Sequence, residues 1–169
     1  MDEFETRKRE VLQPIYCEAG AALFDCQSFE YGIAYLLYLF ARFGADGLDV
    51  KNAVAILEDE EKKTAGQLIG LLKKHLKVSQ GLEEALTKAL KARNKLIHRY
   101  LAENVDRMVT TSEQEKIVKE IRALRSQVRK AHQNLEPFVK SLAKMLDGIS
   151  IDDVTNSAKG KFMSDTRSH

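Results

Sequence analysis

The chain contains few of the residues that interrupt regular secondary structure. Its 169 residues include two prolines, nine glycines and no tryptophan, whereas 44% are hydrophobic and 31% are charged. A sandwich or barrel of many short strands needs frequent turn residues, so the composition argues against those folds. It also excludes collagen-like, low-complexity and wholly disordered chains. We therefore expect a single domain built mainly from long helices.

Cysteine is equally scarce. Cys17 and Cys26 fall on one predicted helix, about 13 Å apart, which is too far for a disulfide. We expect both to be small buried side chains in a reducing compartment. The first residues are rich in charge, so no signal peptide is expected, and the longest apolar stretch, Tyr31 to Phe43, is too short to span a bilayer. The expected location is cytoplasmic, with no membrane partner.

Apolar residues recur at three- and four-residue spacing along much of the chain, which is typical of amphipathic helices. This spacing predicts a long core helix over 11–43, entered or kinked at Pro14 and ended by the glycines of segment 44–47. Seven of the twelve aromatic residues fall between Phe24 and Phe43, and we expect them to form a core wedge between helices.

The rest of the chain predicts further helices and no strand alternation of useful length. These helices are expected over 50–60 with Asp49 as cap, over 65–76 with Thr64 as cap, over 79–105, and from Thr111 or Ser112 to 146 with a break at Pro137. The predicted fold class is all-α: an antiparallel bundle of four main helices with a broken connector helix. The expected domain covers residues 1–148, and a loosely ordered C-terminal tail covers 149–169.

Positive charge is concentrated in one segment of a nearly neutral chain. The formal net charge is +2, but the segment from Lys73 to Arg99 contains eight basic residues and two acidic ones. Such a segment indicates either a phosphate-facing patch or a solvated helix face, and composition does not decide between them. The row of Arg122, Arg125 and Arg129 leaves the same two alternatives open, an RNA track or a solvent-facing stripe.

Four side chains near the end of this segment form the most informative pattern: Arg93, Asn94, His98 and Tyr100. On a helical wheel, Arg93 lies within an apolar stripe and Tyr100 falls about 20° from it. Asn94 and His98 flank that stripe, one turn apart. A guanidinium on a core-facing stripe is costly unless a carboxylate pairs with it or a cleft opens beside it. Arg93 is thus either a structural ion pair, for example with Glu30, or a functional residue, and His98 is either its partner or an ordinary boundary histidine.

The pattern Arg93-Asn94-x-x-x-His98-x-Tyr100, on the third long helix of a small all-helical protein, resembles the signature of the HEPN superfamily. The resemblance covers the helix order over about 11–146, while matching residues are confined to this motif. It implies a HEPN-like fold and, as in many prokaryotic members, a metal-independent endoribonuclease of the toxin–antitoxin or abortive-infection type. It further implies RNA as substrate, a homodimer that brings two Arg-His sets into one cleft, and an antitoxin partner resembling a nucleotidyltransferase. Tyr100 matches a tyrosine that such antitoxins can adenylylate.

The residue types fit metal-free RNA cleavage. This reaction needs a base for the ribose 2′-hydroxyl, an acid for the departing 5′-oxygen and positive charge on the phosphorane. We expect His98 to supply acid–base catalysis, Arg93 to stabilise the charge, and Asn94 to orient His98 or contact the phosphate. No cofactor or metal site is expected, because the histidines lack partners at ligand spacing. The expected substrate-binding residues are Tyr100, Lys95 and Arg99.

Two other functions stay open at this level. One is a non-catalytic HEPN module that binds a nucleotide or RNA in the same cleft. The other is a helical interaction protein in which Arg93 only forms an ion pair. Turnover of RNA by the purified protein separates the endoribonuclease from both alternatives.

Overall fold

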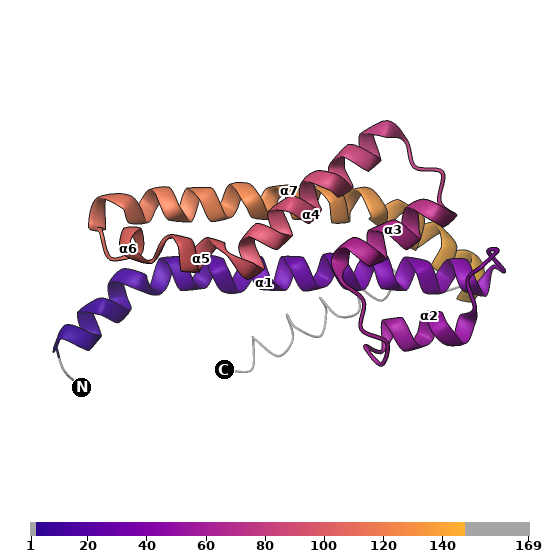
Figure 1. The fold of residues 1–169 in the computed structure, drawn as a ribbon, viewed down its shortest axis with the longest axis horizontal. Helices are drawn as coiled ribbons and strands as arrows, with labels where there is room; N and C mark the ends of the chain where they lie inside the picture. Colours follow the sequence, from indigo (N-terminus) through magenta and orange to yellow (C-terminus); the bar gives the residue numbers. More distant parts are fainter. Residues whose placement is uncertain (1–2, 148–169) are drawn as a thin grey trace, which may run out of the picture.

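The computed structural model describes residues 3–147, which form seven helices and no strand (Figure 1). The all-α prediction is confirmed for this part of the chain. The predicted tail over 149–169 lies outside the described residues. In chain order the helices are α1 (Glu3–Arg42), α2 (Val50–Leu57), α3 (Ala65–His75), α4 (Gln80–His98), α5 (Tyr100–Glu103), α6 (Val105–Met108) and α7 (Thr111–Asp147).

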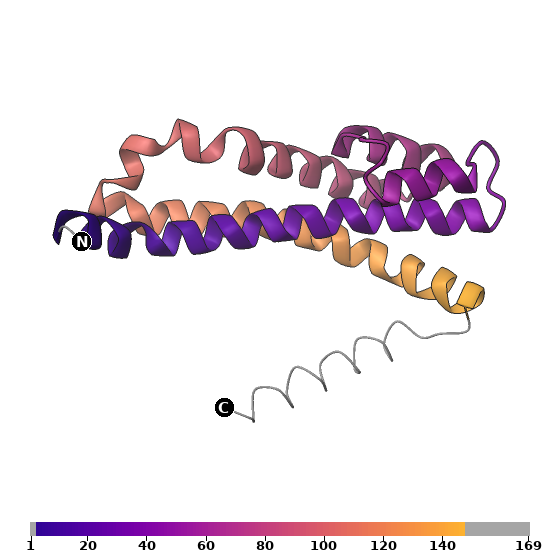
Figure 2. The ribbon, with the colours of Figure 1, turned by 90° about the horizontal axis from the view of Figure 1, so that it is seen from below.

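The two longest helices, α1 and α7, lie side by side and run in the same direction (Figure 1, Figure 2). Their contacts advance together along both helices, since Glu18 pairs with Arg122 and Gly32 faces His132. α4 returns in the opposite direction against both of them. Residues 3–147 thus contain three long helices, α1, α4 and α7, instead of the four predicted. Because each long helix runs opposite to the one before it in the chain, α1 and α7 run parallel.

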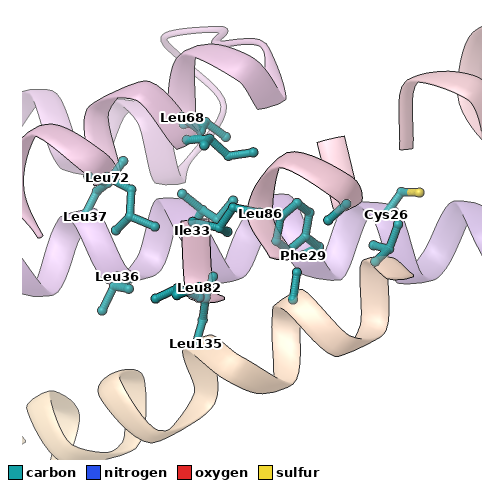
Figure 3. Packing of buried hydrophobic residues seen from close by; sticks show 14 of the residues in the cluster. Cys26, Phe29, Ile33, Leu36, Leu37, Leu68, Leu72, Leu82, Leu86 and Leu135 are labelled. Carbon is teal, nitrogen blue, oxygen red and sulfur yellow. The ribbon is translucent and has the colours of Figure 1, made fainter. Parts of the chain in front are cut away.

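One core cluster fixes α4 against the two long helices. Phe29 and Ile33 of α1 are fully buried at helical spacing and pack in one cluster with Leu86 of α4 and Leu135 of α7 (Figure 3). Full burial of a side chain of this size stabilises the fold by about 1.5–3 kcal/mol. This cluster sets the position of Arg93, which follows Leu86 on the same face of α4 about two turns later.

Side-chain caps fix the starts of the two helices that form the connector. Asp49 Oδ2 accepts a hydrogen bond from the backbone N–H of Asn52 at 3.1 Å. Thr64 Oγ1 accepts from the backbone N–H of Gln67 at 3.3 Å, and Gln67 Oε1 accepts from the backbone N–H of Thr64 at 2.8 Å, which is a capping box. Both predicted caps are confirmed, and each contributes about 0.5–2 kcal/mol.

The helix predicted over 79–105 is wrong beyond His98. α4 ends there because Arg99 adopts φ −134° and ψ −40°, after which the chain turns into α5. The ring of Tyr100 is then 1% exposed and joins a second core cluster with residues of α1, α6 and α7. Burial of this aromatic ring and its hydrogen bond to Glu120 stabilise the break.

A polar network attaches α5 and α6 to α7. Tyr100 Oη donates to Glu120 Oε2 at 2.6 Å, and Arg107 Nη2 donates to Glu120 Oε1 at 2.8 Å. The hydrogen bonds from Arg107 and Tyr100 lower the pKa of Glu120 from 4.5 to about 2. Burial, together with the bond to Glu120, raises the pKa of the Tyr100 phenol. The network therefore holds the chain that follows His98 against α7.

Both prolines lie inside helices, so the predicted break at Pro137 is not a helix end. Instead, Figure 2 shows the C-terminal part of α7 diverging from α1. A proline removes one helical hydrogen bond and bends the helix where the backbone is otherwise well supported. α7 thus continues past Pro137 and reaches Asp147.

One face of α1 stays exposed, which corrects two predictions. Cys26 is buried as predicted, and burial raises the pKa of its thiol to about 11, but Cys17 is exposed. Phe29 is buried, whereas Phe24 and Tyr31 are 69% and 59% exposed, so the aromatic wedge forms only in part. Cys17, Phe24 and Tyr31 are seven residues apart and share one helix face. Within residues 3–147, no helix combines the length and hydropathy needed to cross a bilayer.

We expect the substitution Glu120→Gln to change how stability depends on pH. The native carboxylate of Glu120 binds its proton only near pH 2, whereas the ordinary pKa of the unfolded carboxyl is 4.5. Its contribution to the free energy of unfolding is therefore complete above about pH 4.5 and is lost as the pH falls toward 2. Urea unfolding should show a variant that is less stable at pH 7, with a difference that shrinks across this window.

Glu115→Gln is the matched control on the same helix. Glu115 is 88% exposed and lies 3.9 Å from Lys119, so its removal should have little effect at any pH. A stability deficit of the Glu120→Gln variant that stays constant from pH 7 to pH 2 would contradict the expectation.

Candidate functional site

The guanidinium of Arg93 contacts three other side chains at once. Its Nε donates to Glu30 Oε1 at 2.6 Å, in an ion pair that joins α4 to α1. Its Nη1 donates to Asn94 Oδ1 at 3.2 Å and lies 2.9 Å from His98 Nε2. The side chain of Arg93 is 17% exposed and that of Glu30 is 24% exposed, so the ion pair is half-buried. The pair that the sequence left as an alternative is therefore present, together with the contact to His98.

The contact between Arg93 and His98 fixes the role of one imidazole nitrogen. A guanidinium has only donors, so Nε2 of His98 accepts the hydrogen bond and the neutral ring carries its proton on Nδ1. His98 is the last residue of α4 and is exposed. Its Nε2 becomes available to another proton only when Nη1 of Arg93 turns to a different acceptor.

These side chains line a cavity of about 1,050 Å³ between α4 and the start of α3. The first turn of α3 forms one wall and the second half of α4 forms the other. Glu103 is the one carboxylate among the described residues that line it. A concave surface of one charge sign attracts ions of the opposite sign. Six cations line the cavity: Lys62, Lys63, Lys91, Arg93, Lys95 and Arg99.

Most of the predicted site residues lie together in this cavity. Arg93 is half-buried, as its place on the apolar stripe predicts, and the other members are exposed. Lys95 also places its Nζ 5.6 Å from the centroid of the Tyr100 ring, where a cation–π contact forms. The predicted residues that line the cavity are Arg93, Asn94, Lys95, His98 and Arg99.

Tyr100 is the exception, and its predicted position at the rim of the same cleft is wrong. The helical wheel requires a helix that continues past residue 100, but α4 ends at His98. The ring turns into the core and its hydroxyl donates to Glu120, so it does not line the cavity. This position supports neither predicted role of Tyr100, substrate binding or adenylylation.

Sequence reasoning missed Lys62 and Lys63, which line the cavity from the loop between α2 and α3. The acidic run 58–61 precedes them directly, so the local charge of this loop cancels in a charge count. The available signal was the Thr64 cap, which places both lysines at the start of a helix. Their position opposite α4 depends on tertiary packing, which local sequence does not contain.

The arginines of α7 serve a different purpose from those of the cavity. Arg122 and Arg125 both pair with Glu18 of α1. Burial acts to raise the pKa of Glu18, but the hydrogen bonds from the two arginines outweigh it and lower the pKa. These ion pairs bind α7 to α1, and they favour a structural role for Arg122 and Arg125 over an RNA track.

Comparisons of the chain with protein-family models, curated proteins and solved structures found no match. The relation to the HEPN superfamily stays a resemblance carried by residues 93–100. Among the residues that the structure describes, no group of three or more histidine, cysteine, aspartate or glutamate side chains is arranged to hold a metal ion. The function of the cavity is therefore inferred from the geometry of its own residues.

We expect Glu30 and Arg93 to be energetically coupled. Removing one partner leaves a half-buried charge unpaired, whereas removing both removes that penalty. A double-mutant cycle of Glu30→Ala and Arg93→Ala should give a coupling energy of about 1–3 kcal/mol in the free energy of unfolding. The more exposed pair of Lys73 and Glu83, at 2.7 Å, is the control, with an expected coupling below about 1 kcal/mol. A coupling energy below about 1 kcal/mol between Glu30 and Arg93, as expected for the control, would contradict this expectation.

Proposed function

We propose that the protein is a metal-independent endoribonuclease with a HEPN-like helical fold, acting in the cytoplasm as a toxin or in abortive infection. The observation that carries this proposal is the contact between Arg93 and His98 inside a cavity whose lining is strongly basic. A permanent cation beside an imidazole, in a cavity that attracts anions, provides groups that RNA transesterification needs.

In the proposed reaction the ribose 2′-oxygen attacks the adjacent phosphorus and the bond to the 5′-oxygen breaks. The products are a 2′,3′-cyclic phosphate and a 5′-hydroxyl, and the proton removed from the 2′-hydroxyl is balanced by the one given to the 5′-oxygen. Arg93 suits the phosphorane because a guanidinium presents two parallel donors to two phosphate oxygens. Its Nη2 has no hydrogen bond to any residue within 3–147 and can face a substrate.

His98 fits the acid–base role once a phosphate has bound. A phosphate at Arg93 competes for Nη1, and the negative acceptor is stronger than a neutral imidazole nitrogen. Loss of the bond from Nη1 releases Nε2 of His98, which can then accept the 2′-hydroxyl proton. Asn94 Oδ1 holds Nη1 from the neighbouring position and limits how far the guanidinium turns.

A homodimer would supply the second proton-transfer group. One described chain brings a single histidine to the cavity, whereas the reaction uses both an acid and a base. Two features support an interface next to the site. The exposed stripe of Cys17, Phe24 and Tyr31 leaves apolar surface uncovered on α1. A smaller cavity of about 300 Å³ is lined by Glu30, Tyr31 and Lys63, so this stripe reaches the edge of the site.

The proposed protein partner is an antitoxin that resembles a nucleotidyltransferase. In the described structure the hydroxyl of Tyr100 is bonded to Glu120 and the ring is buried, so adenylylation would require α5 to leave α7. An antitoxin that covers the cavity blocks the reaction without this rearrangement.

The second candidate function is RNA or nucleotide binding without cleavage. It is favoured by the ion pair between Arg93 and Glu30, which already compensates the guanidinium charge in the absence of substrate. A binding protein needs the cations of the cavity but no released imidazole. RNA that binds to the cavity and stays intact would identify this function.

We expect His98→Ala to lose RNA cleavage while keeping its fold. His98 is exposed at the end of α4, so its removal leaves the core unchanged. Loss of a positioned acid–base group lowers the rate by about 10²–10⁴-fold. His132→Gln removes an imidazole outside the cavity and should retain activity. Cleavage is measured on labelled RNA with excess chelator, and either full activity of His98→Ala or loss of wild-type activity on chelation refutes the mechanism.

We expect a homodimer in solution that depends on the exposed stripe of α1. Placing a charge at Phe24→Glu or Tyr31→Glu should shift the protein toward monomer, because the charge would have to be buried at the interface. Val109→Glu changes an equally exposed apolar residue away from the stripe and serves as the control. Light scattering across micromolar concentrations gives the mass. A wild-type protein that stays monomeric throughout excludes the dimer.

A further inference from the structure

Four cations of the cavity have no carboxylate partner among the residues that the structure describes. These are Lys62, Lys91, Lys95 and Arg99, none of which forms an ion pair there, although all four line the same cavity. Arginines elsewhere in this part of the chain, such as Arg107 and Arg125, pair with carboxylates of neighbouring helices. Like charges gathered without counter-charges repel one another, which costs stability unless an anionic ligand compensates them.

These cations come from two separate segments that face one another. Lys91 stands on α4 before Arg93, and Arg99 follows directly after the last residue of α4, while Lys62 and Lys63 precede α3 on the opposite wall. Lys63 is tied to Glu61 at 2.6 Å, so Lys62 is the unpaired cation of that wall. The positive charge therefore extends across the cavity, beyond the reach of a single phosphate bound at Arg93.

The size and the lining of the cavity both indicate a chain of phosphates. Its volume of about 1,050 Å³ is slightly above the roughly 300–1,000 Å³ that enclose one small ligand. Its described lining contains no phenylalanine, tyrosine or tryptophan on which a base could stack. Recognition by lysine and arginine without stacking is typical of contacts to the nucleic acid backbone, which do not depend on sequence.

We propose that Lys62, assisted by Lys63, binds a second phosphate of single-stranded RNA, next to the phosphate held by Arg93. This inference rests on the proposed function, because it takes Arg93 to hold the scissile phosphate. The substrate class is then a single strand with at least two consecutive phosphates. The α2–α3 loop thereby belongs to the substrate site.

Salt dependence of binding tests the second phosphate contact directly. Fluorescence anisotropy with mixed-sequence single-stranded RNA, in the His98→Ala background to prevent cleavage, gives the affinity at increasing salt. The logarithm of the affinity falls as the logarithm of the salt concentration rises, and each lost phosphate contact makes this slope shallower by about 0.7. The Lys62→Ala/Lys63→Ala variant should therefore show a slope that is smaller by about 0.7–1.4.

Lys73→Ala/Lys74→Ala is the matched control. It removes two adjacent lysines from the end of α3, neither of which lines the cavity, so it changes net charge equally without touching the site. Its salt slope should equal that of the parent. If the Lys62→Ala/Lys63→Ala variant also keeps the parent slope, the second phosphate contact does not exist.

Cleavage of short substrates separates this proposal from the proposed function. With His98 present, a trinucleoside diphosphate should be cleaved with a kcat/KM about tenfold or more above that of a dinucleoside monophosphate, and Lys62→Ala/Lys63→Ala should abolish this preference. Equal cleavage of both substrates by the wild-type protein overturns the second phosphate contact and leaves the endoribonuclease intact. A changed salt slope without any cleavage supports the contact and overturns the endoribonuclease.

Discussion

The half-buried guanidinium of Arg93 is the group on which the structure around the site depends. It stands on a helix stripe that packs against α1, where a charge is tolerated only with a partner. Glu30 supplies that partner at 2.6 Å and so fixes the approach of α4 to α1. The cost of burying this charge is offset by contacts of the guanidinium with Glu30, Asn94 and His98. The same contacts gather the motif residues Asn94 and His98 around that guanidinium.

The end of α4 is a second constraint, because it determines what the motif can do. A helix that ran on would carry Tyr100 to the same side as Arg93 and would leave His98 in mid-helix. Burial of the Tyr100 ring and its bond to Glu120 stop the helix at His98 instead. The imidazole therefore lies at a helix end, open to the cavity, while the following residues stay attached to α7.

Sequence reasoning succeeds here wherever the signal is local. The caps at Asp49 and Thr64, the apolar spacing of α1 and the placement of Arg93 on a stripe all follow from residues within one or two turns. The break after His98 does not follow from nearby residues, because Glu120, which bonds Tyr100 and so stabilises the break, lies on another helix. The parallel course of α1 and α7 and the position of Lys62 opposite α4 likewise depend on how distant helices pack.

The geometry of the ion pair itself argues for a site over a purely structural contact. A guanidinium used only as a structural cation gains most from a bidentate carboxylate, which accepts from two of its nitrogens at once. Here Glu30 takes Nε, and the terminal nitrogens face neutral acceptors on Asn94 and His98 or no described residue. A phosphate can therefore bind the terminal edge without breaking the ion pair. In the proposed reaction the bond that the phosphate displaces is the one to Nε2 of His98, so binding of the anion and release of the base would be the same event.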